Sequence, residues 1–191
     1  FGRVADIVVD TLRSLCGTSQ ISSAARAGTN AEGCPSPDEI EQRKALLFQI
    51  RTSLLPDLRT QISELLISLN ISNLDIEPSP QLLASLAVIR KLEHTLDQLR
   101  FATQSIAINL LSIPVRVDHD LMEFNICELF RHCIVFLQAW NSSHDDHHLP
   151  STTLRPATDS IAPRKAIILT TALSCRTIQE LIEWLQLDEF G

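Results

Sequence analysis

The side chains best suited to chemistry are concentrated in one short stretch, which contains His144, Asp145, Asp146, His147 and His148. Imidazole nitrogens and carboxylate oxygens can bind zinc or nickel, so the stretch is a candidate metal site. Metal ligands are usually held on rigid elements, whereas residues 141–160 are rich in Ser, His and Pro and are typical of a long polar loop. We therefore interpret the stretch as a solvated loop, with metal binding as the alternative.

A second candidate, made of Asp118, His119 and Asp120, contains the groups of an acid–base set. The same residues also fit the start of a helix, because carboxylates there interact favourably with the helix dipole. Asp120 and Glu123 stand at the spacing of a capping box, in which side chains bind the first free backbone amides. We favour the capping interpretation and expect these residues to open a helix.

The cysteines form an odd set with no C-x-x-C pair and no regular spacing: Cys16, Cys34, Cys127, Cys133 and Cys175. Cys133 follows His132, but neighbouring residues of a helix point about 100° apart and cannot form a nucleophile–base pair. Four of the cysteines fall in stretches with a helical pattern, where a thiol acts as a small hydrophobic side chain. We expect buried, reduced cysteines rather than disulfides.

Recognised catalytic motifs are missing from the sequence, which has no glycine-rich phosphate loop, nucleophile elbow, zinc-protease motif or calcium loop. The net charge of −7 argues against binding of nucleic-acid phosphates, which depends on clustered Lys and Arg. The nearest candidate for a membrane span, Ile106–Val117, contains Asn109, Pro114 and Arg116 and is too short. The sequence therefore predicts no catalytic, cofactor-binding or metal-binding residues, no nucleic-acid partner and no membrane span.

The elements that hold these residues follow from the composition. Of the 191 residues 45% are hydrophobic and 20% are charged, and the chain has only five glycines and no tyrosine. This balance favours long packed helices over turn-rich sheets, with a core mainly of Leu, Ile, Val and Ala. Since single domains commonly reach about 100–200 residues, we expect one helical domain over residues 1–191.

Five stretches repeat apolar side chains every three or four residues, which is the spacing of one helix face. They are residues 1–15, 36–69, 82 to beyond 101, 118–140 and 163–189. Proline lacks the amide hydrogen of the helix ladder, so we expect a kink or short break at Leu54 to Pro56, with the apolar stripe continuing in register. The sequence thus predicts an all-α fold, an up-and-down helical bundle of about five amphipathic helices with one helix kinked or broken at Pro56.

The ends of these helices carry further signals. Ser36, Pro37 and Glu39 combine an N-cap, a proline at the first helical position and a capping box. Ser79-Pro80 has the same order of N-cap and proline. The helix that begins there is expected to end at Pro114. Residues 17–37 are rich in Ser, Ala, Thr and Gly, which predicts a flexible linker.

The last helix is expected to bury one apolar row, made of Ile168, Ala172, Cys175, Ile178, Ile182 and Leu185. Trp140 and Trp184 lie on or beside apolar rows near the ends of helices. An exposed tryptophan is a common anchor for a partner, but we favour packing in the core for both.

The compartment is suggested by indirect signals. Reduced cysteines favour an intracellular location. Asn70-Ile71-Ser72 and Asn141-Ser142-Ser143 match the glycosylation pattern, which matters only in a secreted chain. Because the chain begins at Phe1 rather than at methionine, secretion through a preceding signal is the alternative.

Three segments carry a resemblance: Arg43–Leu47, then Leu54-Leu55-Pro56-Asp57-Leu58-Arg59-Thr60-Gln61-Ile62, and the late Thr177–Leu185 with its Trp-Leu pair. In style and order they resemble an expanded family of uncharacterised helical proteins from rust fungi, over about half of the chain. The resemblance implies an all-helical fold, an unannotated function and lineage-specific expansion. It supplies no catalytic residues.

We expect a non-catalytic helical module that binds another protein, because the sequence combines continuous apolar stripes with an acidic composition and no motif for catalysis. The alternative is a carrier that holds a small molecule or lipid between its helices, where bundles can form cavities. A metal-dependent enzyme centred on His144–His148 is the third hypothesis.

Overall fold

The computed structural model describes residues 2–24, 36–71, 74, 78–106, 113–145 and 161–187. Its helices are α1 (Gly2–Ala24), α2 (Pro37–Gln49), α3 (Leu55–Ser68), α4 (Leu82–Ser105), α5 (Ile113–Asp145) and α6 (Ile161–Leu187), and the π-helical turn η1 (Ile50–Leu54) joins α2 to α3. No strand occurs in these residues, and none of their helices is long and apolar enough to cross a membrane. With α2, η1 and α3 counted as one broken rod, the predicted all-α fold of five helical rods is confirmed.

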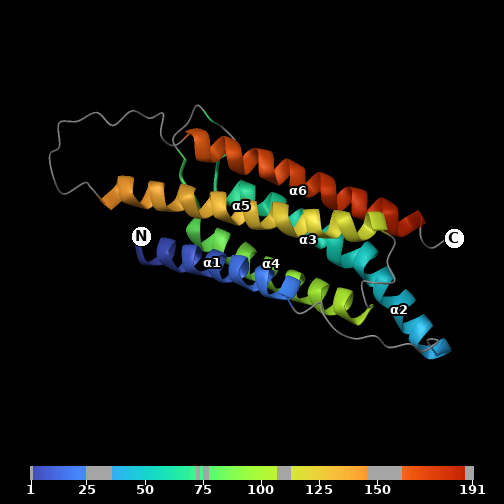
Figure 1. The fold of residues 1–191 in the computed structure, drawn as a ribbon. Coiled ribbons are helices and arrows are strands. Elements are labelled where there is room, and N and C mark those ends of the chain that lie inside the picture. Colours follow the sequence, from blue (N-terminus) through green and yellow to red (C-terminus); the bar gives the residue numbers. More distant parts are fainter. Residues whose placement is uncertain are drawn as a thin grey trace.

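Successive rods run in opposite directions, as in an up-and-down bundle (Figure 1). Their order around the bundle differs from their order in the chain, because α1 packs against α4 and α5, α3 packs against α4 and α6, and α5 packs against α6. Each rod therefore has two neighbours, and the five close into a ring around the core. At one end α2 extends from the bundle, and none of its 13 residues is buried.

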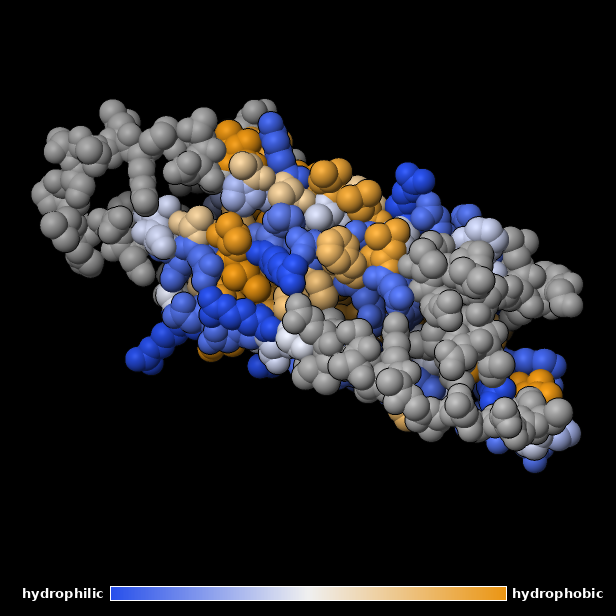
Figure 2. All heavy atoms as spheres, viewed as in Figure 1, coloured by the Kyte–Doolittle hydropathy of each residue, from blue (hydrophilic) through white to orange (hydrophobic). Residues whose placement is uncertain are grey.

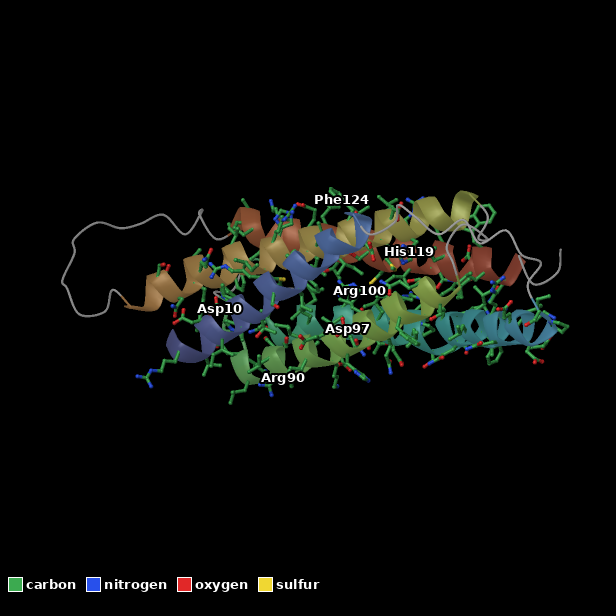
Figure 3. The ribbon with its side chains drawn as sticks, turned by 60° about the horizontal axis from the view of Figure 1, so that its bottom comes forward. Asp10, Arg90, Asp97, Arg100, His119 and Phe124 are labelled. Carbon is green, nitrogen blue, oxygen red and sulfur yellow. The ribbon has the colours of Figure 1, made fainter. Side chains whose placement is uncertain are left out.

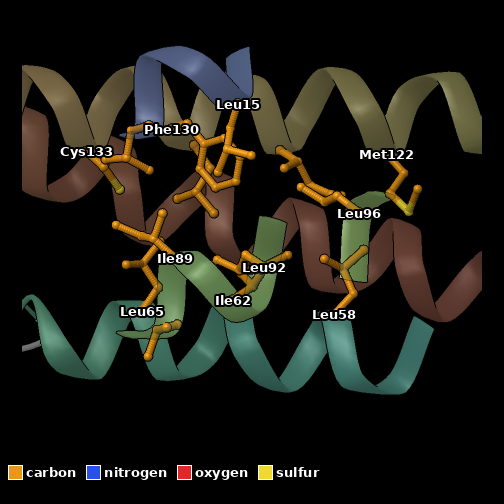
Figure 4. Packing of buried hydrophobic residues seen from close by; sticks show 14 of the residues in the cluster. Leu15, Leu58, Ile62, Leu65, Ile89, Leu92, Leu96, Met122, Phe130 and Cys133 are labelled. Atoms are coloured by element: carbon orange, nitrogen blue, oxygen red, sulfur yellow. The ribbon is translucent and has the colours of Figure 1, made fainter. Parts of the chain in front are cut away.

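The apolar stripes meet in one hydrophobic cluster, to which α1, η1, α3, α4, α5 and α6 all contribute. Figure 4 shows Leu58, Ile62 and Leu65 of α3 facing Leu92 and the residues around it on α4, with α5 beyond them. Most members of the predicted rows are buried on the second rod (Ile50, Leu54, Leu58, Ile62, Leu65, Leu69), on α4 (Leu82, Ile89, Leu92, Leu96, Leu99) and on α5 (Met122, Ile126, Leu129, Cys133, Phe136). Leu47 and Trp140, also predicted in the rows of the second rod and of α5, are only half-buried. Since each such side chain contributes about 1.5–3 kcal/mol when buried, these rows hold the bundle together.

The break before Pro56 is a widened turn rather than a sharp kink. The amide of Leu55 donates to the carbonyl of Ile50, five residues back, which is the bonding pattern of a π-helix. Pro56 then lies in the first turn of α3, the position of a helix in which proline is most often found. The buried row continues from Ile50 to Leu69. The prediction of a short break at Leu54 to Pro56, with the apolar stripe continuing in register, is therefore confirmed.

The start of α2 is also confirmed. The amide of Glu39 donates to Ser36 Oγ at 3.2 Å, and the amide of Ser36 donates to Glu39 Oε2 at 2.8 Å, which completes the capping box. At α4, in contrast, the prediction is wrong. The helix begins at Leu82 after Gln81, not after Ser79-Pro80, because the amide of Gln81 donates across to the carbonyl of Ser68 at 2.8 Å.

The start of α5 differs most from the prediction. The helix begins at Ile113, so Pro114 opens this helix rather than ending the one before it, and α4 ends earlier, at Ser105. Proline suits the first turn of a helix because the amides there have no partner within the helix. Asp118–Asp120 therefore lie inside α5, and the interpretation of these residues as its cap is wrong.

The expected flexible linker, residues 17–37, and the expected long polar loop, residues 141–160, both begin with helix. Residues 17–24 continue α1, since each added helical residue gains a backbone bond once a helix exists, and residues 25–35 lie outside the described part. Residues 141–145 continue α5, where the hydroxyls of Ser142 and Ser143 each donate at 2.9 Å to carbonyls of the preceding turn. The rest of the expected loop, 146–160, also lies outside the described residues.

Candidate functional site

The histidine-rich stretch cannot be assembled into a site from the described residues. His144 and Asp145 belong to the last turn of α5, and residues 146–148 lie outside the described part. Within the described ranges, no three His, Cys, Asp or Glu side chains stand close enough to hold a metal ion. The metal hypothesis for His144–His148 stays a prediction.

The imidazole of His119 is buried on the core side of α5, with 7% of the residue exposed. Its Nδ1 is 3.7 Å from Oδ1 of Asp120, and among the described residues neither ring nitrogen has a hydrogen-bond partner. Figure 3 shows His119 among the helices and Phe124, a little further along α5, at the outer edge. Within the part of the chain that the structure describes, no hydrogen bond orients the His119 imidazole for acid–base chemistry, and the ring packs on the core side of α5.

Two cysteines from distant parts of the chain lie together between α1 and α5. The thiol of Cys16 donates to the carbonyl of Cys127 at 3.8 Å, and the four described cysteines are all free. Burial, and then the nearby Cys127, raises the pKa of the Cys16 thiol to about 11. Burial also raises the pKa of the Cys133 thiol. Since the thiolate is the reactive form, Cys16 and Cys133 are poor nucleophiles.

Two hollows are open to solvent on the surface of the bundle. One, of about 490 Å³, lies between α1 and α5 and is lined on its polar side by Asp6, Asp10, Arg13, Gln138 and Asn141. The other, of about 400 Å³, lies between α2 and α4 and includes Leu46, His94 and Phe101. Neither has the enclosed apolar walls with few polar groups that are usual in a ligand pocket.

A group of large apolar side chains is exposed on the outer side of α5 and α6. We call it the α5–α6 face, and it consists of Leu121, Phe124, Val135, Leu169, Leu173 and Trp184, which are between 40% and 61% exposed. Figure 2 shows hydrophobic side chains along these two helices, interleaved with hydrophilic ones. Half of the large hydrophobic side chains that are exposed in the described residues belong to this one pair of helices.

Two pairs of opposite charge lie on the α5–α6 face, each within a single helix. Arg131 forms an ion pair with Glu128 on α5, and Arg176 Nε donates to Glu180 Oε1 at 2.8 Å on α6. The hydrogen bond with Glu180 raises the pKa of Arg176. These two pairs add no net charge to the face, although the chain carries −7.

A buried hydrogen bond sets the level of α5 against α6. Asn125 Nδ2 donates to Thr177 Oγ1 at 3.2 Å, and both residues are less than one-tenth exposed. Because a buried polar pair is costly to separate, it fixes how the two antiparallel helices are aligned along their length.

The sequence missed the α5–α6 face because the buried row of α6 was only partly predicted: Ile178 and Leu185 are buried as expected, but the other members of the predicted row are not. The helix buries Ile167, Thr171, Ser174, Thr177, Ile178, Leu181 and Leu185, so that Ala172 is exposed and Ile168, Cys175 and Ile182 are half-buried. Ser174 and Thr177 can be buried because their hydroxyls donate to carbonyls four residues back, at 2.8 and 3.0 Å. Trp184, expected in the core, is 40% exposed. Leu169 and Leu173, large apolar residues that share one side of the helix outside the predicted row, were the available signal.

The comparisons with known proteins place most of the bundle in one family model. The model, described as "Domain of unknown function (DUF8723)", matches residues 43–124 and 119–186, which together include η1, α3, α4, α5 and nearly all of α6. Neither a curated protein nor a solved structure matches the chain.

Proposed function

Because the chain belongs to the family described as a domain of unknown function (DUF8723), whose description gives no activity, we propose a function from the structure: a non-catalytic helical module that binds a protein through the α5–α6 face. The observation that carries the proposal is the group of six large apolar side chains on that face. Exposed apolar groups of this size are typical of binding surfaces in soluble proteins.

The size of the face supports this proposal. Aromatic side chains offer about 150–250 Å² each and aliphatic ones somewhat less, so the exposed fractions amount to roughly 600 Å² of apolar surface. The largest apolar patch on a typical monomer is about 300–600 Å². Trp184 and Phe124 supply the aromatic anchors on which binding energy is often concentrated.

The charge of the face supports a protein as the partner. Nucleic acid is bound by clustered Lys and Arg, whereas here Arg131 and Arg176 are each paired with a glutamate. The carrier hypothesis finds no comparable support, since both hollows are open to solvent.

The proposal is tested by capturing partners with the tagged chain and comparing two matched variants. Leu169→Glu places a charge on the face, and Leu83→Glu places the same charge on α4, where Leu83 is 74% exposed and away from the face. We expect a specific partner to be lost with Leu169→Glu and kept with Leu83→Glu. A partner that both variants keep contradicts the proposal. The proposal is also contradicted if the wild type captures no specific partner.

The likeness to an expanded family of rust fungi is also part of this proposal. It is supported by the order of the segments Leu54–Ile62 and Thr177–Leu185. Counting matches to the family model in rust fungi and in other fungi tests it, and equal numbers in both groups contradict it.

A further inference from the structure

We propose that the α5–α6 face binds a second copy of this chain, with α5 antiparallel to α5 and α6 antiparallel to α6 across a two-fold axis. The inference rests on the proposed function, because it names the partner of the same face. Two-fold symmetric dimers are the commonest oligomers, and they require a surface that is complementary to itself. The residues on α5 and α6 meet this requirement.

On α5 the point through which the two-fold axis passes lies midway between Glu128 and Arg131. When two α5 helices pack antiparallel about this point, Glu128 lies opposite Arg131 of the second copy, and the reverse pair forms by symmetry. Phe124 and Val135 stand equally far on either side of the same point, so they also lie opposite each other. Phe124 is 59% exposed and Val135 is 52% exposed, which leaves both free to make this contact.

On α6 the corresponding point lies between Ala172 and Leu173. Lys165 and Glu180 stand equally far on either side of it and carry opposite charges, so each lies opposite the other across the axis. Lys165 is exposed and has no ion pair within the described ranges, so it gains one in the dimer.

The two points lie at the same level of the bundle, which allows a single axis to pass through both. The hydrogen bond between Asn125 and Thr177 places these residues side by side. The point on α5 lies as far beyond Asn125 as the point on α6 lies before Thr177, and the helices are antiparallel with the same rise per residue. The alignment that places Glu128 opposite Arg131 on α5 therefore also places Lys165 opposite Glu180 on α6.

The area of the α5–α6 face and the net charge of the chain are compatible with a second copy of the chain as the partner. A stable interface buries about 800 Å² on each partner, which the roughly 600 Å² of apolar surface and the polar side chains between them can supply. Two chains of −7 repel each other, but the two ion pairs on the α5–α6 face add no net charge there, so they do not add to the repulsion where the chains meet.

The first test is sedimentation of the full chain between about 1 and 200 µM, the range in which a weak dimer dissociates. We expect the wild type to dimerise and Arg131→Glu to lower the association constant at least about tenfold, because it sets like charges against each other. Combining Glu128→Arg with Arg131→Glu recreates the symmetric pairs, and we expect association within about threefold of the wild type. Arg13→Glu is the matched control, because it breaks an equivalent pair with Asp10 on α1 and leaves the face unchanged.

The second test is cross-linking with a reagent that spans about 8 Å, the separation of packed helices. Ala172 lies beside the axis and Ala162 lies far from it, and both are exposed on α6. We expect Ala172→Cys to cross-link to its own counterpart above the wild-type background. Ala162→Cys should not, because about 30 Å separates the two copies of that residue.

Three results separate this inference from the proposed function. A wild type that stays monomeric at the highest concentration overturns the dimer, and if it still captures another protein that Leu169→Glu loses, the proposed function stands. A dimer that resists Arg131→Glu, or one in which Ala162→Cys cross-links as readily as Ala172→Cys, overturns the two-fold arrangement. If the dimer fails and no protein is captured, both the inference and the proposed function are contradicted.

Discussion

Ser68 and Ser85 face each other across the turn between α3 and α4, with their Oγ atoms 2.9 Å apart and both residues buried. Each hydroxyl also has a backbone carbonyl within reach, that of Leu65 for Ser68 and that of Gln81 for Ser85. The carbonyl of Ser68 accepts from the amide of Gln81 at 2.8 Å. This polar contact sits at the end of the leucine rows and fixes where α4 begins.

Removal of one hydroxyl should therefore leave the other without its buried partner. We expect Ser68→Ala to lower the free energy of unfolding by about 1–2 kcal/mol, and Ser85→Ala by a similar amount. The double variant should lose less than the sum of the two, because the contact between the two hydroxyls is lost only once. Urea unfolding of the four proteins measures this, and strict additivity contradicts the contact.

Substitution of His119 should raise the free energy of unfolding rather than lower it. Since its ring nitrogens have no hydrogen-bond partner in the described residues, we expect His119→Leu to raise the free energy of unfolding by about 1 kcal/mol. His94 is exposed, so His94→Leu serves as the control and should change stability by less than about 0.5 kcal/mol. A loss of stability with His119→Leu means that the imidazole makes a stabilising contact.

Asn70 ends α3 in a left-handed conformation, with φ of 52°. Glycine and asparagine tolerate this conformation, whereas a β-branched side chain clashes with the backbone. We expect Asn70→Gly to leave stability nearly unchanged and Asn70→Val to lower it by about 1–2 kcal/mol. Asn70 is exposed, so lost packing cannot explain a difference, and equal stability of the two variants argues against the left-handed turn.

Alkaline pH should destabilise the bundle through its buried thiols. Burial raises the pKa of Cys16 from 9.0 to about 11 and raises that of Cys133 in the same direction, so the folded chain holds these protons more tightly than the unfolded chain does. The stabilising effect is full below about pH 9 and is lost as the pH rises through the folded value. No tyrosine titrates in the same range.

Urea unfolding between pH 8 and pH 11 checks this dependence. We expect the free energy of unfolding to fall across that range, and to fall less steeply in Cys16→Ala and in Cys133→Ala. The slopes are compared rather than the absolute values, because Cys133→Ala also removes packing in the core. Identical slopes in all three proteins contradict a role for the thiols.

Local chemistry explains which parts of the fold could be predicted from the sequence. The row from Ile50 to Leu69 follows from apolar spacing alone, and the capping box of Ser36 and Glu39 involves residues three apart. Pro56 predicts the interruption of the helix, because the missing amide hydrogen is a property of proline itself. These features need no knowledge of distant contacts.

Features that depend on distant contacts could not be predicted. Leucine rows are chemically alike, so nothing in them specifies that α1 neighbours α4 and α5 rather than α3. Pro114 is equally suited to follow one helix or to open the next. On α6, Ser174 and Thr177 are polar by type but satisfied by their own helix, which hid the buried row and, with it, the α5–α6 face.

The central claim, that the α5–α6 face is a binding surface, is tested most directly by the fluorescence of Trp184. The chain has two tryptophans and no tyrosine, so Trp140→Phe leaves Trp184 as the only strong fluorophore. We expect emission at long wavelength and ready quenching by acrylamide in the dilute monomer, since Trp184 is 40% exposed. On association, whether with a second copy or with another protein, the emission should shift to shorter wavelength and the quenching should fall. A Trp184 that is already protected in the monomer, or that stays fully quenchable in the complex, contradicts the account.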